Sequence, residues 1–146
     1  MHSVRKSLLV PHTTVQMYDL VDRVEDYPTF IPWCAGARVL EVRPDGKTAR
    51  LDIDYRGVKA HFTTDNSESP PNQIVITLRD GPFRHLHGEW RFRGLGEDAC
   101  KVEFELAYEF ANALLEKVVG PMFNYIANTF VDAFIDRADV LYAASP

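Results

Sequence analysis

Apolar and polar residues alternate along most of the chain, with the period of two that is typical of a strand that buries one face. The segment 48–55 is a clear case, because its odd positions are apolar and its even positions are polar or charged. Between Ala37 and Phe110 the pattern predicts six such strands, and another precedes them at Val4–Val10. Short turn sequences, including Arg56-Gly57, join them. This order predicts an antiparallel meander.

Two short helices are predicted after the first strand. Pro11 ends that strand, and Thr13 and Gln16 then have the spacing of a capping box, which begins a short amphipathic helix. The segment 24–34 contains two prolines, each of which restricts the residue before it, and it fits a second short helix or a turn.

A long helix is predicted at the C-terminal end. Asn112 is a typical N-cap, and the helical period continues to about Tyr142 across Gly120-Pro121, where we expect a kink. The predicted apolar stripe consists of Leu115, Val119, Met122, Ile126, Phe130, Ala133 and Leu141. A helix with so long an apolar face needs a large partner surface. We therefore predict an α+β fold in which a curved six- or seven-stranded antiparallel sheet wraps around the C-terminal helix.

Length and charge narrow the class of protein. The 146 residues fit a single domain over 1–146, and the net charge of −5 argues against general binding of nucleic acid, DNA included. Arg79, Arg84, Arg91 and Arg93 are a local exception, which we interpret first as a solvated strand face. The chain shows no signal peptide and no apolar run of membrane-spanning length, so we expect a cytoplasmic protein. Its two cysteines are expected to be free thiols.

Three separated segments carry a family resemblance. They are VEDYPTFIPWC at 24–34, LRDGPFRHLHGEWRF at 78–92 and FVDAFIDRADVLY at 130–142. Together they resemble the coenzyme Q-binding (polyketide-cyclase-like) family of the START-like, or SRPBCC, superfamily, which also includes proteins described as ribosome-association toxins. The resemblance implies a helix-grip fold. It also implies a non-enzymatic carrier of ubiquinone, or of its polyprenyl tail, that supports respiration from a position peripheral to the inner membrane.

The same resemblance leaves two alternatives open. The toxin description implies binding to the large ribosomal subunit, for which the chain needs an exposed basic face; Arg84, Arg91 and Arg93 are the obvious source. The third alternative is a polyketide-type cyclase, for which Tyr55, Tyr108 and Arg137 are the only candidates that could move a proton.

For the carrier we expect a hydrophobic cavity between sheet and C-terminal helix. The predicted cavity residues are Tyr27, Phe30, Trp33, Tyr55, Phe62, Trp90, Phe104, Tyr108, Val119, Met122, Ile126, Phe130 and Arg137. The segment 27–33 forms either a lid or membrane-dipping edge, or a plug of the core. Arg137 either binds a quinone head group or forms an ion pair, with Glu25 or Asp26 among the partners considered. We expect no metal, because His85 and His87 have no third ligand at a recognisable spacing, and no cofactor beyond bound ubiquinone.

Overall fold

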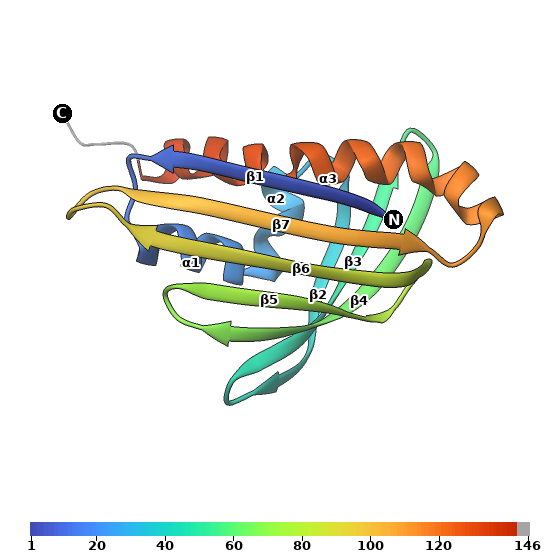
Figure 1. Cartoon of the computed structure of the whole chain (residues 1–146), viewed down its shortest axis with the longest axis horizontal. Coiled ribbons are helices and arrows are strands. Elements are labelled where there is room, and N and C mark those ends of the chain that lie inside the picture. Colours follow the sequence, from blue (N-terminus) through green and yellow to red (C-terminus); the bar gives the residue numbers. More distant parts are fainter. Residues whose placement is uncertain (143–146) are drawn as a thin grey trace.

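A seven-stranded antiparallel sheet and a long helix organise residues 1–142, the part of the chain that the computed structural model describes (Figure 1). The strands are β1 (His2–Val10), β2 (Cys34–Arg43), β3 (Gly46–Tyr55), β4 (Val58–Ser69), β5 (Gln73–Asp80), β6 (Phe83–Gly94) and β7 (Cys100–Phe110). The helices are α1 (Thr14–Asp22), the 3-10 turn η1 (Val24–Asp26), α2 (Tyr27–Phe30) and α3 (Ala113–Leu141). The sheet order is β1-β7-β6-β5-β4-β3-β2, so the predicted meander and fold class are confirmed.

The turns have the predicted chemistry. Arg56 and Gly57 both have positive φ angles, 51° and 81°, which suits the tight two-residue turn between β3 and β4. Gly46 begins β3 where the chain passes very close to β4, because a Cβ atom there would lie 2.0 Å from the Asn66 carbonyl oxygen.

Side-chain alternation gives the sheet two different faces. On β6, Leu86, Trp90 and Phe92 are buried on the inner face, which α3 covers, whereas Arg91 and Arg93 lie on the outer face. The register carries this pattern onto β7, where Trp90 pairs with the buried Phe104. The core therefore lies between the inner face of the sheet and the helices.

Both predicted helix caps are present. The Thr13 hydroxyl accepts from the Gln16 backbone N–H at 3.1 Å, and the Gln16 side chain accepts from the Thr13 N–H at 2.9 Å. Asn112 Oδ1 accepts from the Leu115 N–H at 2.9 Å and caps α3. The helix continues through Pro121 to Leu141, and Figure 1 shows its first turns inclined to the rest, as expected from the proline.

The buried face of α3 rotates along its length. Val119, Met122 and Ile126 are buried as predicted, but further along the buried positions are Val131, Phe134 and Ala138. Leu141 was predicted in the stripe and is 46% exposed, so that part of the prediction is wrong. A single straight stripe assumes a flat partner, whereas a twisted sheet meets successive turns of a helix on gradually different sides. Arg137 consequently lies at the edge of the buried face.

Candidate ligand-binding cavity

A cavity lies between the inner face of the sheet and α3. Its volume is about 70 Å³, measured as the space open to the centres of water molecules. Four α3 residues form one wall: Phe123, Ile126, Ala127 and Phe130. Of the predicted site residues, those that line the cavity are Tyr27, Trp33, Phe62, Trp90, Phe104, Ile126 and Phe130. The lining is almost entirely apolar, which suits a hydrophobic guest.

Other predicted site residues lie elsewhere. Tyr55 and Met122 line a separate open groove at the N-terminal half of α3. Val119 and Tyr108 are buried outside the cavity, and the Tyr108 hydroxyl donates to Asn124 Oδ1. Phe30 packs beside Phe134, with 5.4 Å between ring centroids. Residue periodicity gives the buried face correctly, but it does not fix how far along the sheet each side chain meets the helix.

The segment 27–33 faces inward. Tyr27, Ile31 and Trp33 are 5% exposed or less, and the exposed positions include the two prolines. The Tyr27 ring lies 5.1 Å from Phe134, and its hydroxyl donates to the Val21 carbonyl. The segment therefore forms a wall of the core and cavity, which favours the plug over a membrane-dipping edge, although Phe30 is only half-buried.

Arg137 lies beside Phe30, without the ion pair that was one of its two expected roles. Its guanidinium lies over the Phe30 ring, 5.6 Å from the centroid, and it does not line the cavity. Within residues 1–142 it forms no ion pair, with Glu25, Asp26 or any other acidic group. The rotation of α3 explains this position, since it moves Arg137 from the middle of the buried face to its edge, where the side chain reaches water.

One end of the cavity is polar, and sequence reasoning missed it. Asp22, Thr64 and Asn66 line this end, and Lys47 lies directly behind Asp22. Lys47 Nζ lies 2.8 Å from Asp22 Oδ1 and 3.5 Å from Glu68 Oε1, and it donates to the Asp22 carbonyl at 3.0 Å. Polar residues at inward positions of β3 and β4 were the available signal, because Lys47 pairs with Asn66 in register and Glu68 follows two residues later.

Burial controls the electrostatics of this cluster. Burial raises the pKa of Glu68 to about 7, and the neighbouring Asp22 adds to the effect, while Lys47 opposes it. Burial alone would lower the pKa of Lys47, but the hydrogen bond and charge of Asp22 outweigh it and the pKa is raised. Burial, then the charge of Glu68, also raises the pKa of the Tyr18 hydroxyl. Lys47 is therefore charged at neutral pH, whereas Glu68 is poised to exchange a proton.

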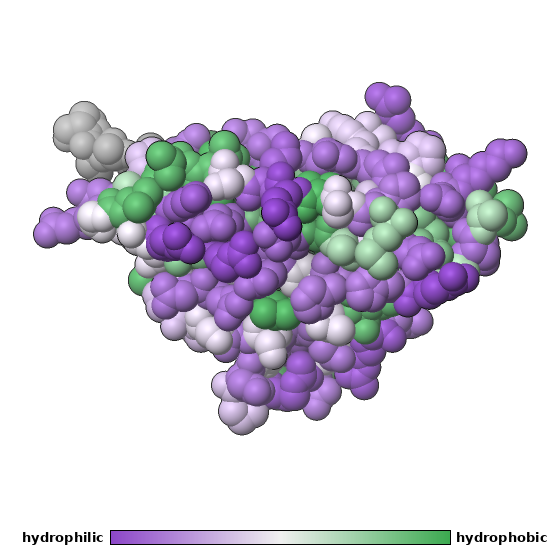
Figure 2. Space-filling model, in the orientation of Figure 1, coloured by the Kyte–Doolittle hydropathy of each residue, from purple (hydrophilic) through white to green (hydrophobic). Residues whose placement is uncertain are grey.

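The outer face of β6 and β7 carries a network of ion pairs. Arg91 lies within 3.4 Å of Glu89, Glu103 and Glu105, and Arg93 lies 3.5 Å from Glu103. Arg84 lies 3.6 Å from Glu109. In Figure 2 hydrophilic residues cover most of this side of the molecule, and hydrophobic ones form separate small patches. The arginines therefore form the solvated strand face of the first interpretation, and they do not form the basic face that ribosome binding would need, because glutamates on β6 and β7 pair with them.

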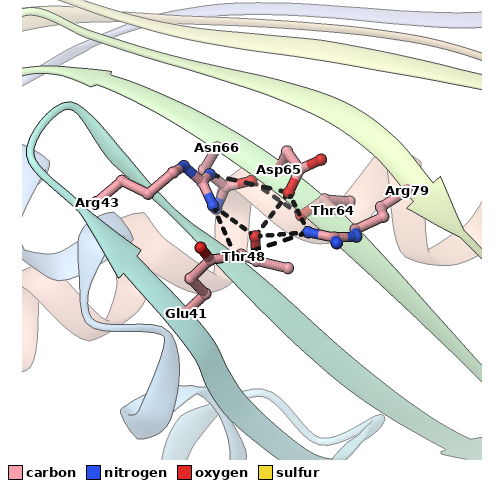
Figure 3. A network of polar contacts seen from close by, with 7 residues as sticks. All are labelled: Glu41, Arg43, Thr48, Thr64, Asp65, Asn66 and Arg79. Carbon is pink, nitrogen blue, oxygen red and sulfur yellow. Dashed lines mark hydrogen bonds and ion pairs between the residues drawn. The ribbon is translucent and has the colours of Figure 1, made fainter.

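A second polar network links β2, β3, β4 and β5. Figure 3 shows Arg43 and Arg79 reaching toward Thr48 and Asp65 from two sides. The Thr48 hydroxyl, 2% exposed as a residue, donates to Asp65 Oδ1 at 2.6 Å and accepts from Arg43 at 2.8 Å. The hydrogen bond from Thr48, with the charges of Arg79 and Arg43, holds the pKa of Asp65 below its usual range, against the effect of burial. This network fastens four strands together.

Three structural features bear on the predicted chemistry. Within residues 1–142, no group of three His, Cys, Asp or Glu side chains is placed to hold a metal ion. No helix of that same part of the chain is long and apolar enough to cross a membrane. The three residues considered for proton transfer do not meet: Tyr108 bonds to Asn124, Tyr55 stacks on Tyr125, and Arg137 lies over Phe30.

Comparison with known proteins places this chain in a family. Residues 10–135 match the family described as "Polyketide cyclase / dehydrase and lipid transport", and the chain belongs to this START-like family. Among its relatives, the "Ribosome association toxin RatA" of Pseudomonas aeruginosa is 40% identical over 95% of this chain and 96% of that protein. The mitochondrial "Coenzyme Q-binding protein COQ10 homolog B" of Xenopus laevis is 31% identical over 87% of this chain and 54% of its own length.

A solved structure shows the same fold at low sequence identity. The Zhui aromatase/cyclase of a Streptomyces species has a TM-score of 0.80 and 20% identity, covering 98% of this chain and 96% of that one. The relatives above are named as toxin and binding proteins, whereas this neighbour of similar fold is named as a cyclase. One scaffold therefore serves more than one activity, and the function has to be argued from the site.

Proposed function

We propose that this protein binds a hydrophobic molecule of the isoprenoid quinone class between α3 and the sheet, and carries it without converting it. The observation that carries the proposal is the aromatic, apolar cavity, with Trp33, Trp90 and Phe130 in its walls. The relative named for coenzyme Q binding supports the ligand class. Each buried CH₂ group contributes about 0.8 kcal/mol, so a polyprenyl chain needs few polar contacts. Such a carrier would collect its ligand at the cytoplasmic surface of the inner membrane.

Ligand entry has to widen the cavity. Its volume of about 70 Å³ is well below the roughly 300–1,000 Å³ of pockets that enclose drug-sized ligands. The bend of α3 near Pro121 is the natural place for the helix to move, since a proline removes one helical hydrogen bond. Binding would therefore displace α3 from the sheet.

Organic extraction of the freshly purified protein tests this proposal. We expect near-stoichiometric ubiquinone or a related isoprenoid in the extract, identified by mass spectrometry and ultraviolet absorbance. An empty extract, repeated after incubation with quinone in detergent and washing, would count against the carrier function.

Ribosome association is the second candidate, because a relative of similar length carries that name. One exposed feature suits contact with RNA. Tyr55 and Tyr125 are stacked, 5.3 Å between centroids, and the Arg56 guanidinium lies 5.3 Å from the Tyr55 ring. Aromatic rings beside an arginine can stack on unpaired bases and contact phosphate.

Cosedimentation with large ribosomal subunits at low and high salt tests the second candidate. We expect binding that falls with salt and is lost in Arg56→Glu with Tyr125→Ala. The matched control is Arg91→Gln, whose side chain is already tied to glutamates and should leave binding unchanged. Absence of cosedimentation at low salt would contradict ribosome association.

A further inference from the structure

An open groove lies between the N-terminal half of α3 and the turn that joins β3 to β4 (Figure 1). Its volume is about 510 Å³, by the same measure that gives about 70 Å³ for the cavity. Arg56 is the only charged residue that lines it in the described part of the chain. The other lining residues are Tyr55, Val58, Val118, Pro121, Met122 and Tyr125. This hollow is called the outer groove below, and its largely apolar lining suits an apolar guest.

The outer groove and the cavity share the inner face of the β3–β4 hairpin. On β4, Phe62 lines the cavity and Val58 lines the groove. Strand alternation puts both side chains on the same face, and only one inward position, Ala60, lies between them. Ala60 pairs with Ile53 on β3, and both pack in the core. One pair of apolar residues, one of them as small as alanine, therefore separates the two hollows on this wall.

α3 forms the opposite wall of both hollows. Phe123 and Ile126 line the cavity, whereas Met122 and Tyr125, their neighbours in the chain, line the groove. Met122 is 6% exposed, and its unbranched side chain changes shape at low cost. The bend near Pro121 falls in the same turns of the helix. A ligand that widens the cavity toward the N-terminal half of α3 would therefore open it into the outer groove.

The outer groove leaves large apolar side chains open to water. Val118 and Tyr125 are 55% and 46% exposed, and with Pro121 they lie on one face of α3. Adjoining exposed apolar side chains of this kind mark a binding surface. The cavity, by contrast, is much smaller than pockets that enclose even drug-sized ligands. A ring with a polyprenyl tail therefore needs further apolar surface, and the outer groove is continuous with the walls of the cavity.

We propose that the outer groove holds the polyprenyl tail of a ligand whose ring lies in the cavity. This inference rests on the proposed function and adds the place where the tail binds. The tail passes Ala60 and Met122 and covers Val118 and Tyr125. Ring and tail are then held by different residues, so the affinity gained from a longer tail depends on the groove.

A chain-length series tests the tail site. The probes are the 2,3-dimethoxy-5-methyl-benzoquinone ring carrying no, one, two or three isoprene units. Binding is measured by quenching of Trp33 and Trp90, the two tryptophans of the chain, both of which line the cavity. We expect each added unit to raise the affinity of the native chain about tenfold, since five carbons enter an apolar groove that is open on one side.

Variants assign this gain to the groove. Val118→Asp places a charge at an exposed position, so the chain should fold normally. The gain per isoprene unit should fall below about threefold, while binding of the ring without a tail stays within about twofold of the native chain. Val140→Asp is the matched control, because it makes the same change at a 70% exposed position of α3 that lines neither hollow, and it should keep the full gain. Tyr125→Ser serves if Val118→Asp does not fold.

The outcomes separate the tail site from the proposed function. A gain that is the same in the native chain and in both groove variants, or no gain in the native chain, would overturn the tail site and leave the carrier function standing. If Val118→Asp kept the gain but dissociated a dimer in light scattering, or lost ribosome cosedimentation, the groove would belong to a second copy of the chain or to RNA, and the tail site would be wrong. Failure of every probe to bind would overturn both proposals.

Discussion

The Phe130 ring on α3 lies 5.8 Å from the indole of Trp90 on β6, centroid to centroid, and both line the cavity. Phe130 stands at the same distance from Trp33 and from Phe104. One residue of the helix therefore meets three aromatic walls of the cavity. The cavity volume that is available to a ligand therefore depends on the position of the Phe130 ring.

Phe130→Ala should enlarge the cavity and lower the free energy of unfolding by about 2–4 kcal/mol, since the ring is largely enclosed by aromatic contacts. Urea unfolding followed by circular dichroism measures this change. Leu114→Ala on the same helix is the matched control: Leu114 is 70% exposed, and its loss should cost less than about 0.5 kcal/mol. Equal effects of the two substitutions would show that Phe130 is not packed against the sheet as described.

Glu68→Gln should change how stability depends on pH. Because burial raises the folded-state pKa of Glu68 from 4.5 to about 7, the folded state holds this proton more tightly than the unfolded state. The contribution of Glu68 to the free energy of unfolding is therefore complete below about pH 4.5, and it is lost as the pH rises through 7. We expect Glu68→Gln to be more stable than the native chain at about pH 8, on the order of 2 kcal/mol, with no advantage near pH 4.

Chemical unfolding across this pH range measures the Glu68 effect. Glu97→Gln, at an exposed position between β6 and β7, is the control and should follow the native curve. A constant difference between Glu68→Gln and the native chain from pH 4 to 8 would contradict the raised pKa.

Asp65→Asn should weaken the four-strand network. The change replaces the charged acceptor of the buried Thr48 hydroxyl and leaves two arginines beside a neutral group. A loss of about 1 kcal/mol in unfolding free energy is expected, mostly from the Thr48 bond, because the arginines are partly solvated. Since the pKa of Asp65 is lowered in the folded state, the native chain should lose this contribution as the pH falls below the usual aspartate range. Asp80→Asn, at an exposed position of β5, should have no such effect.

The two cysteines should react slowly in the folded protein. Both are buried free thiols, and burial raises the pKa of Cys34 to about 11, so only about one molecule in a thousand carries the thiolate near pH 8. Alkylation followed by mass spectrometry should be at least about 100-fold slower in buffer than in urea. Rapid labelling of one thiol under native conditions would contradict the burial of that residue.

Residue alternation in the strands and the capping residues of the helices predicted the architecture well. Alternation along β3 and β6 placed Leu51 and Trp90 on the inner face, and Thr13 and Asn112 cap their helices as expected. Periodicity could not reveal the rotation of the buried face of α3, because that depends on the twist of the partner sheet. Arg137 was misplaced for this reason.

The cluster of Asp22, Lys47 and Glu68 was beyond sequence reasoning in a different way. The inward positions of Lys47 and Glu68 follow from strand register, but their partner Asp22 lies at the end of α1, and only tertiary packing brings it there. The glutamates that neutralise Arg91 come from β6 and β7, and the β7 pair is opposite it only once the two strands are in register. Long-range pairing therefore decided both the site and the surface charge.

The most direct test of the cavity is an isotope-filtered nuclear Overhauser experiment on the ¹³C-labelled protein with a short-chain ubiquinone. We expect contacts between the quinone ring methyl group and the side chains of Trp90, Phe104 and Phe130. Contacts confined to exposed residues such as Leu9 and Leu114, or none at saturating quinone, would contradict binding between α3 and the sheet.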